Sequence, residues 1–196
     1  SKAITVTETR TGNAASLTGD VPQLFVREKV SGLPSYTAIY SPTKTGTYTL
    51  AARHLMKGGL APSYFDNQHL LQAPVIQRID PTVNFNWGTG LITSYGRDYV
   101  SARWSGKLLP TTSEQYTLYV FAEDGARLYI DHKLVIDAWD VANSGLESKA
   151  VVSLSKGTYH DIKLEYKEET GSARISLKWS SYSVSKTVIP TTALYH

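Results

Sequence analysis

The stretch YTLYVFAEDGARLYI, residues Tyr116–Ile130, decides the fold class of this chain. On both sides of Gly125, alternate side chains are apolar, with a period of two, which is typical of β-strands with one buried face. Between these two runs lie Glu123, Asp124 and Gly125, an acidic pair next to a residue type that favours turns. The stretch therefore predicts two strands joined by a short acidic loop.

Alternating runs of this kind recur along the chain, for example at Thr47–Ala51 and Arg174–Trp179. Thr, Val, Ile and Tyr, which favour strands, are abundant, and turn signals that contain glycine separate the runs. No segment sustains a helical period. Many short strands with frequent turns predict an all-β protein with an antiparallel β-sandwich.

The composition restricts the classes of function. The 196 residues are 41% hydrophobic, which allows a packed core, and the net charge is only +3. Because no basic stripe is present, we expect no nucleic-acid partner. The apolar runs are too short to cross a bilayer, so we expect no membrane insertion. Cysteine is absent, which removes disulfides, thiolate metal sites and cysteine nucleophiles.

A change of composition near Met56–Gly59 divides the chain. Residues 1–58 are rich in Thr and Ser and have few aromatic residues, whereas aromatic residues are dense in residues 59–196. The pair Gly58-Gly59 is too short for a long tether, so we expect two abutting domains with these bounds.

A series of motifs runs through residues 59–196. In chain order they are Gly59-Leu60, Tyr64-Phe65, Asp80-Pro81, Trp87-Gly88, Arg103-Trp104, Glu123-Asp124-Gly125, Leu134–Trp139, Lys163–Tyr166, Leu177–Ser180 and Val188–Pro190. In this order and spacing they closely resemble the protective-antigen fourteen-kilodalton domain family, named after the anthrax toxin component. The resemblance implies a protective-antigen-type antiparallel β-sandwich.

Residues 1–58 resemble part of a second family. Ile4–Val6 predicts an early strand, and Tyr36–Leu50 contains a Tyr-x-x-x-Tyr strand, a Pro-Thr turn and a Gly-Thr-Tyr start of the next strand. This order is similar to the late hairpin of a filamin-type repeat. We therefore expect a partial immunoglobulin/filamin-like β segment, without the usual first strand, before the sandwich.

The resemblance of residues 59–196 implies a calcium site. In the sugar-binding members of that family, chiefly yeast flocculins and related adhesins, two consecutive aspartates joined by a cis peptide hold Ca²⁺, which holds sugar hydroxyls. Glu123 and Asp124 fall on these positions, with glutamate replacing the first aspartate. Glu168 lies nearest the position of an asparagine ligand, and Glu169 is its neighbour. Because Ca²⁺ prefers oxygen ligands, these four residues are the predicted metal ligands.

The acidic loops also have a simpler interpretation. Asp124-Gly125 and Thr170-Gly171 are turn signals, and they would then be ordinary hairpin turns whose neighbouring acidic side chains are hydrated. In that case no cation is bound.

The tryptophans divide into two groups. Trp87, Trp104 and Trp179 lie in expected strands that match the family's core pattern. Trp139 lies in an expected loop beside Asp140, and an aromatic ring at the rim of a site can contact the apolar face of a sugar. Trp139 and Asp140, with Gly125 of the acidic loop, are the predicted ligand-binding residues.

We expect no enzymatic activity. The five histidines are scattered, and neither a zinc-protease motif nor a serine-nucleophile elbow is present. Glu123 and Asp124 are consecutive, so they do not resemble two carboxylates that face each other across a glycosidase cleft. The expected function is a lectin- or adhesin-like binding module that uses Ca²⁺ to bind a carbohydrate or glycoprotein surface, within a larger surface or extracellular protein.

Two other functions stay open at this point. The chain would suit a structural or protein–protein interaction module of a large repeat protein, in contact with other repeats of the same polypeptide and including an intracellular setting. It would also suit an accessory domain of a glycosidase or toxin.

Overall fold

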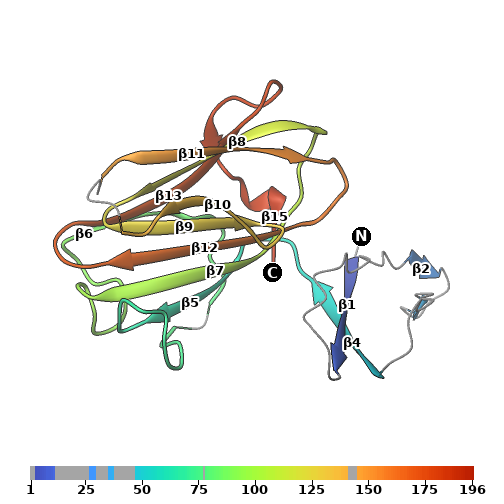
Figure 1. Cartoon of the computed structure of the whole chain (residues 1–196), viewed down its shortest axis with the longest axis horizontal. Helices are drawn as coiled ribbons and strands as arrows, with labels where there is room; N and C mark the ends of the chain where they lie inside the picture. Colours follow the sequence, from blue (N-terminus) through green and yellow to red (C-terminus); the bar gives the residue numbers. More distant parts are fainter. Residues whose placement is uncertain (1–2, 12–26, 30–34, 38–46, 77, 141–144) are drawn as a thin grey trace. The chain divides into compact units, whose positions relative to one another are not determined.

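A computed structural model describes residues 3–11, 27–29, 35–37, 47–76, 78–140 and 145–196. The chain splits into two compact units, Ser1–Met56 and Lys57–His196. Their strands are labelled in Figure 1. No helix in the described ranges is long and apolar enough to cross a membrane.

The N-terminal unit contains two antiparallel strand pairs. One joins β1 (Ala3–Thr11) to β4 (Thr47–Leu55), and the other joins β2 (Arg27–Lys29) to β3 (Ser35–Thr37). The strand expected at Ile4–Val6 is part of β1. Most of the filamin-like hairpin expected in Tyr36–Leu50 lies outside the described residues, and its described ends, in β3 and β4, pair with β2 and β1 instead.

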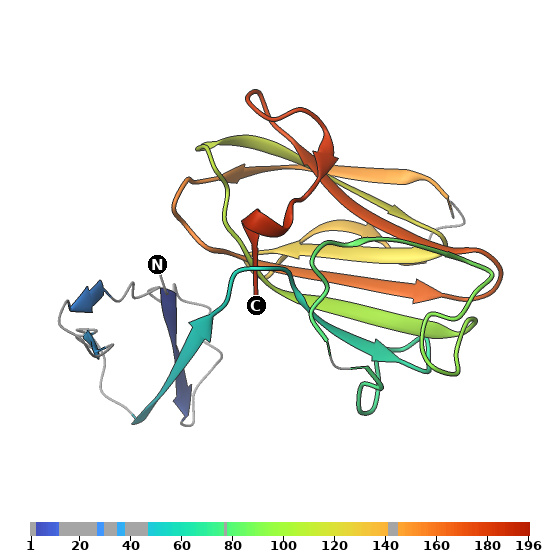
Figure 2. The ribbon, with the colours of Figure 1, turned by 180° about the vertical axis from the view of Figure 1, so that it is seen from behind.

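The C-terminal unit is built from two antiparallel sheets, drawn as two layers in Figures 1 and 2. The first sheet has the order β10-β9-β12-β7-β15, with β5 also paired to β7. Its strands are β5 (Ala61–Phe65), β7 (Val100–Leu108), β9 (Gly125–Ile130), β10 (Lys133–Ala138), β12 (His160–Glu168) and β15 (Leu194–Tyr195). A short 3₁₀ turn, Thr191–Ala193, precedes β15.

The second sheet has the order β11-β8-β13-β14, with β6 also paired to β13. Its strands are β6 (Asn84–Gly88), β8 (Glu114–Ala122), β11 (Glu147–Leu154), β13 (Ala173–Ser180) and β14 (Thr187–Val188). The expected all-β sandwich is therefore confirmed.

The core lies between the two sheets and is formed by alternate residues of their strands. In β8 the buried residues are Tyr116, Leu118, Val120 and Ala122, as the period of two predicts. Trp104 and Trp179 are buried, which confirms their expected place in the core. Trp87 is only partly buried, but its ring stacks on Phe85 with centroids 5.0 Å apart and packs against the core.

The motif Asp80-Pro81 has a structural role. The buried carboxylate of Asp80 accepts hydrogen bonds from the Tyr64 hydroxyl at 2.7 Å, the Trp104 indole N–H at 2.7 Å and Arg78 Nε at 2.6 Å. Since a buried charge is stable only when it is paired and hydrogen-bonded, these three donors explain why an aspartate is tolerated beside the core.

Both acidic loops pass from one sheet to the other. The loop at Glu123-Asp124 joins β8 of the second sheet to β9 of the first, and the loop after Glu168 joins β12 of the first sheet to β13 of the second. The interpretation of these loops as hairpin turns is therefore wrong. Both loops lie at the same end of the sandwich, on the left in Figure 1.

Candidate functional site

The two acidic loops are joined by direct hydrogen bonds. The Glu169 amide donates to Oδ2 of Asp124 at 2.6 Å. The Glu123 amide donates to the Arg174 carbonyl at 2.9 Å, which holds the first loop against the start of β13. The structure therefore places Glu123, Asp124, Glu168 and Glu169 at one end of the sandwich; their role as metal ligands stays a prediction.

Asp124 adopts a left-handed backbone conformation, with φ of 66°. This conformation is uncommon outside glycine, although aspartate adopts it more readily than most residues. The described residues contain no cis peptide bond, so the bond between Glu123 and Asp124 is trans, in contrast to the cis aspartate pair of the sugar-binding family members.

Glu168 is the most unusual residue of the site. It is the last residue of β12, and the alternation of that strand turns its side chain inward, on the same side as Leu164 and Tyr166. The side chain is fully buried. The Tyr166 hydroxyl donates to Oε2 at 2.7 Å, but Oε1 is buried and has no hydrogen-bond partner among the residues that the structure describes.

The surroundings of Glu168 oppose its ionisation. Burial is the largest cause. The hydrogen bond from Tyr166 favours the ionised form, whereas the charge of Asp124, a hydrogen bond with the Asp124 side chain and the charge of Glu123 oppose it. Together they raise the pKa of Glu168 to about 7. A carboxylate in this position is satisfied by a proton or by a cation placed between it and Asp124.

The side chains of the site offer the type of ligand that Ca²⁺ prefers, which is oxygen, but fewer ligands than Ca²⁺ needs. Ca²⁺ takes six to eight oxygen ligands, and carboxylates and backbone carbonyls are suitable ones. Within the described ranges, no three His, Cys, Asp or Glu side chains are grouped closely enough to hold a metal by themselves. Backbone oxygens and hydroxyls of a ligand would have to complete a shell based on Asp124 and Glu168.

Lys167 engages two other predicted site residues. Its ammonium lies 2.8 Å from Oε1 of Glu169 and 3.4 Å from Oδ1 of Asp140. The side chain of Glu169 is therefore directed to Lys167, and its backbone amide, rather than its carboxylate, contacts Asp124. Asp140 is exposed and shares the same cation.

Gly125 is explained by packing. A Cβ atom at this position would collide with the carbonyl oxygen of Trp139 and lie 2.7 Å from Cε of Lys167. The absence of a side chain lets the segment that contains Trp139 approach the acidic loop. The role of Gly125 in ligand contact stays a prediction.

Trp139 lies among cations. The Arg127 guanidinium lies 4.2 Å and the Lys167 ammonium 5.6 Å from the centroid of its ring. Attraction between a cation and the face of an indole ring favours this arrangement. Trp139 is only partly buried, and its contact with a ligand stays a prediction.

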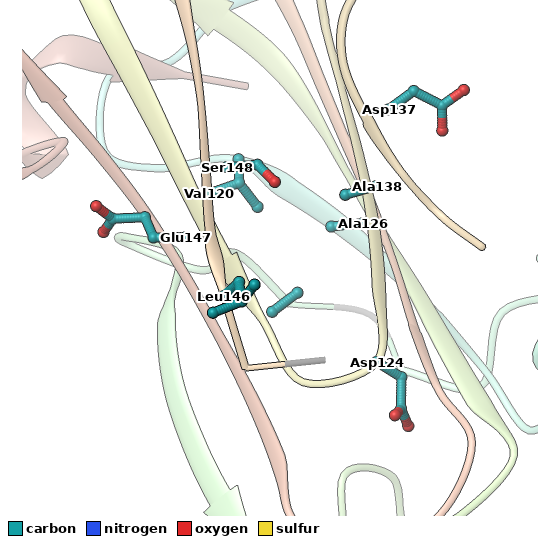
Figure 3. A pocket seen from close by; sticks show the side chains of 9 residues that line it. Val120, Asp124, Ala126, Asp137, Ala138, Leu146, Glu147 and Ser148 are labelled. Carbon is teal, nitrogen blue, oxygen red and sulfur yellow. The ribbon is translucent and has the colours of Figure 1, made fainter. Parts of the chain in front are cut away.

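A cavity of about 220 Å³ opens between the sheets beside Asp124. Figure 3 shows Ala126 and Ala138 along one wall, with the carboxylates of Asp124, Asp137 and Glu147 pointing away from the small side chains. Glu147 was not among the predicted site residues. It is a single acidic residue at the start of β11, and the sequence does not reveal which strand lies beside it.

A third loop, which the sequence predictions missed, lies beside the second acidic loop. The Tyr99 amide donates to the Glu169 carbonyl at 2.9 Å, and the Gly171 amide donates to Oδ1 of Asp98 at 3.2 Å. The side chains of Tyr95 and Tyr99 are 89% and 57% exposed. Large exposed aromatic side chains next to a polar loop are candidates for ligand contact.

Comparison with known proteins gives a consistent result for the C-terminal unit. The PA14 domain family matches residues 56–193. Anti-sigma-I factor RsgI3 of Acetivibrio thermocellus is 40% identical over 138 residues, which are 70% of this chain and 21% of that protein. The chain thus spans about a fifth of the length of this curated relative.

Two solved structures are also similar. An anti-sigma factor domain-containing protein from Clostridium clariflavum is 42% identical, with a TM-score of 0.65 over 70% of this chain and 46% of that chain. A PA14 sugar-binding domain from an RTX adhesin is 13% identical, with a TM-score of 0.54 over 72% of this chain and 99% of that chain. At this low identity, the second likeness shows a shared fold alone.

Proposed function

The chain belongs to the PA14 domain family, and from this premise we propose that its C-terminal unit binds carbohydrate with the help of Ca²⁺. The site is the end of the sandwich where the loops of Asp124 and Glu168 meet. Its mechanism is coordination and hydrogen bonding, without covalent chemistry.

The observation that carries this proposal is the buried carboxylate of Glu168. In the described ranges its Oε1 atom has no hydrogen-bond partner, and the charges of Asp124 and Glu123 repel the carboxylate. A divalent cation between Glu168 and Asp124 would coordinate the unpartnered oxygen and would also offset the repulsion between the carboxylates. Glu123 adds negative charge near the ion without being grouped closely enough to complete a three-residue site, while Glu169 remains paired with Lys167.

Carbohydrate supplies the oxygen ligands that the protein lacks. Since two carboxylates cannot complete a shell of six to eight oxygens, vicinal hydroxyls of a sugar are suitable further ligands. The exposed rings of Tyr95 and Tyr99, on the loop hydrogen-bonded to Glu169 and Gly171, would contact the apolar face of the same sugar. The sugar-binding domain of the RTX adhesin, which shares this fold, supports the same class of ligand.

The relatives support a proposed setting. Two of them are named as anti-sigma factor proteins, and the chain spans less than half of each. We therefore place the domain in a larger protein, where it presents the loop end of the sandwich to glycans at the cell surface. An open site of this kind binds single sugars weakly, and repeated display would strengthen binding.

Calorimetric titration of Ca²⁺ into protein stripped with EDTA tests the metal part of the proposal. We expect binding by the wild type, together with a rise in melting temperature, because a ligand that binds only the native state stabilises it. Glu168→Gln and Asp124→Asn should each lower the affinity at least tenfold. Glu169→Gln is the matched control and should change it by less than about threefold, because its carboxylate is bound to Lys167.

Two results would contradict the proposal. One is the absence of both heat and a melting shift for the wild type at millimolar Ca²⁺. The other is an unchanged Ca²⁺ isotherm for Glu168→Gln in a protein that is still folded.

A further inference from the structure

The outer face of the first sheet carries a hollow of about 350 Å³. Arg103 of β7, Glu165 of β12, and Arg127 and Tyr129 of β9 form its floor, and Trp139 and His69 lie at its edge. Neither Asp124 nor Glu168 lines it. The hollow thus contains neither proposed calcium ligand, although it adjoins the acidic loops at Trp139.

The floor is organised by the register of three strands. Glu165 of the central strand β12 lies opposite Arg103 of β7 on one side and opposite Arg127 of β9 on the other. The three side chains therefore form one row across the sheet. Nε and Nη2 of Arg103 each lie 3.0 Å from Oε1 of Glu165, and Lys163 Nζ lies 3.5 Å from the same oxygen.

Arg127 does not join this ion pair. Among the residues that the structure describes, no carboxylate pairs with it, although it is the cross-strand neighbour of Glu165. Its guanidinium stacks on Trp139 instead, and its Nε is buried without a hydrogen-bond partner. Two cations of the floor, Arg103 and Arg127, thus flank the single carboxylate of Glu165, and the floor carries an excess of one positive charge.

Aromatic rings stand next to these cations. The Lys163 ammonium lies 3.8 Å from the centroid of Tyr129, and Trp139 lies against Arg127. A planar guanidinium fixed on a ring is suited to hold a carboxylate through two parallel hydrogen bonds. Partly exposed Tyr and Trp rings beside it suit the apolar face of a pyranose. The volume of the hollow is within the range of small-molecule sites.

We propose that this hollow is a second carbohydrate site, which binds an acidic sugar of the hexuronate class. Arg127 receives the carboxylate, Arg103 is held in place by Glu165, and the rings of Trp139 and Tyr129 contact the pyranose. Because arginine supplies the positive charge, binding here does not need Ca²⁺.

The test uses the full chain in the presence of EDTA, which switches off the calcium site. Isothermal calorimetry is run with an oligogalacturonate, with the methyl-esterified form of the same oligosaccharide, and with an acidic peptide of poly-glutamate. We expect the oligogalacturonate to bind in EDTA, the esterified form to bind at least tenfold more weakly, and added salt to weaken the binding.

Arg127→Gln should weaken oligogalacturonate binding at least tenfold while the melting temperature changes little, since Arg127 lies on the outer face of the sheet and, among the described residues, forms no ion pair that the substitution would break. The matched control is Arg174→Gln, because the Arg174 guanidinium stacks 4.9 Å from the Phe121 ring in the second sheet. This variant should bind within about twofold of the wild type.

Several outcomes would overturn the assignment: no binding in EDTA, equal binding of the esterified sugar, or wild-type affinity in Arg127→Gln. If poly-glutamate binds as tightly as the oligogalacturonate and depends equally on Arg127, the hollow is an acidic-peptide site and the sugar assignment is wrong.

Discussion

At the scale of single residues, Glu168 shows how the alternation of a β-strand can bury a carboxylate. The alternation that buries Leu164 and Tyr166 also buries the carboxylate two positions further on, at the end of the strand. Tyr166 satisfies one of its oxygens, and within the described part of the chain no hydrogen-bond donor is found for the other. The same geometry that opposes ionisation makes the group a strong partner for a cation.

The raised pKa of Glu168 predicts how stability depends on pH without calcium. An unfolded glutamate has a pKa of about 4.3, whereas burial and the neighbouring carboxylates raise the folded pKa of Glu168 to about 7. The unfolded state therefore loses its proton first, and this group's contribution to stability is lost as the pH rises from about 4 through 7. In EDTA, the melting temperature of the wild type should fall more steeply over this range than that of Glu168→Gln.

Thermal melts at closely spaced pH values check this expectation. Equal slopes for the wild type and Glu168→Gln would contradict it. Saturating Ca²⁺ should flatten the wild-type profile, because a cation beside Glu168 favours its charged form.

Part of the site could be read from sequence at this scale. The acidic loops were found because acids cluster beside turn signals, and the core positions of Trp104 and Trp179 followed from their strands. The pairing of Lys167 with Glu169 was not predicted, although residues two apart share a face of an extended chain. The row formed by Arg103, Glu165 and Arg127 depends on the register of three distant strands, which no local pattern contains.

At the scale of elements, the sequence predicted where strands occur, but it did not predict which strands pair with each other. Alternation within β8 and β9 is the same whether the two strands form a hairpin or belong to different sheets. The structure places them in different sheets, so the Glu123-Asp124 loop crosses the end of the sandwich. That crossing brings the loop against the residue that follows β12, where Asp124 meets the Glu169 amide.

The pairing of β15 with β7 gives a test of the packing of elements. A Cβ atom on Gly106 would collide with the carbonyl oxygen of Tyr195 and lie 2.7 Å from Cδ2 of Leu60. Gly106→Ala should therefore displace β15 and lower the free energy of unfolding by about 1–3 kcal/mol. Ser105→Ala, an exposed position on the same strand, should have little effect. Denaturant unfolding of both variants measures this, and equal stability would refute the packing argument.

At the scale of the whole molecule, the chain is two compact units with one well-defined sandwich. The hydrophobic cluster of the second unit extends from Leu60 to Leu194 and joins both of its sheets. A fragment of residues 57–196 should therefore unfold cooperatively and bind Ca²⁺ with the affinity of the full chain. Thermal unfolding and calorimetry of the fragment check this. A broad, non-cooperative transition would show that the sandwich depends on the first unit.

The central claim is that Ca²⁺ held by Asp124 and Glu168 binds carbohydrate. Its most direct test is the binding of the full chain to an array of neutral glycans in Ca²⁺ and in EDTA, with Glu168→Gln beside the wild type. We predict that the wild type binds a subset of neutral glycans in Ca²⁺, that EDTA abolishes this binding and that Glu168→Gln lacks it. Equal binding in EDTA, or no neutral glycan bound in Ca²⁺, would contradict the claim.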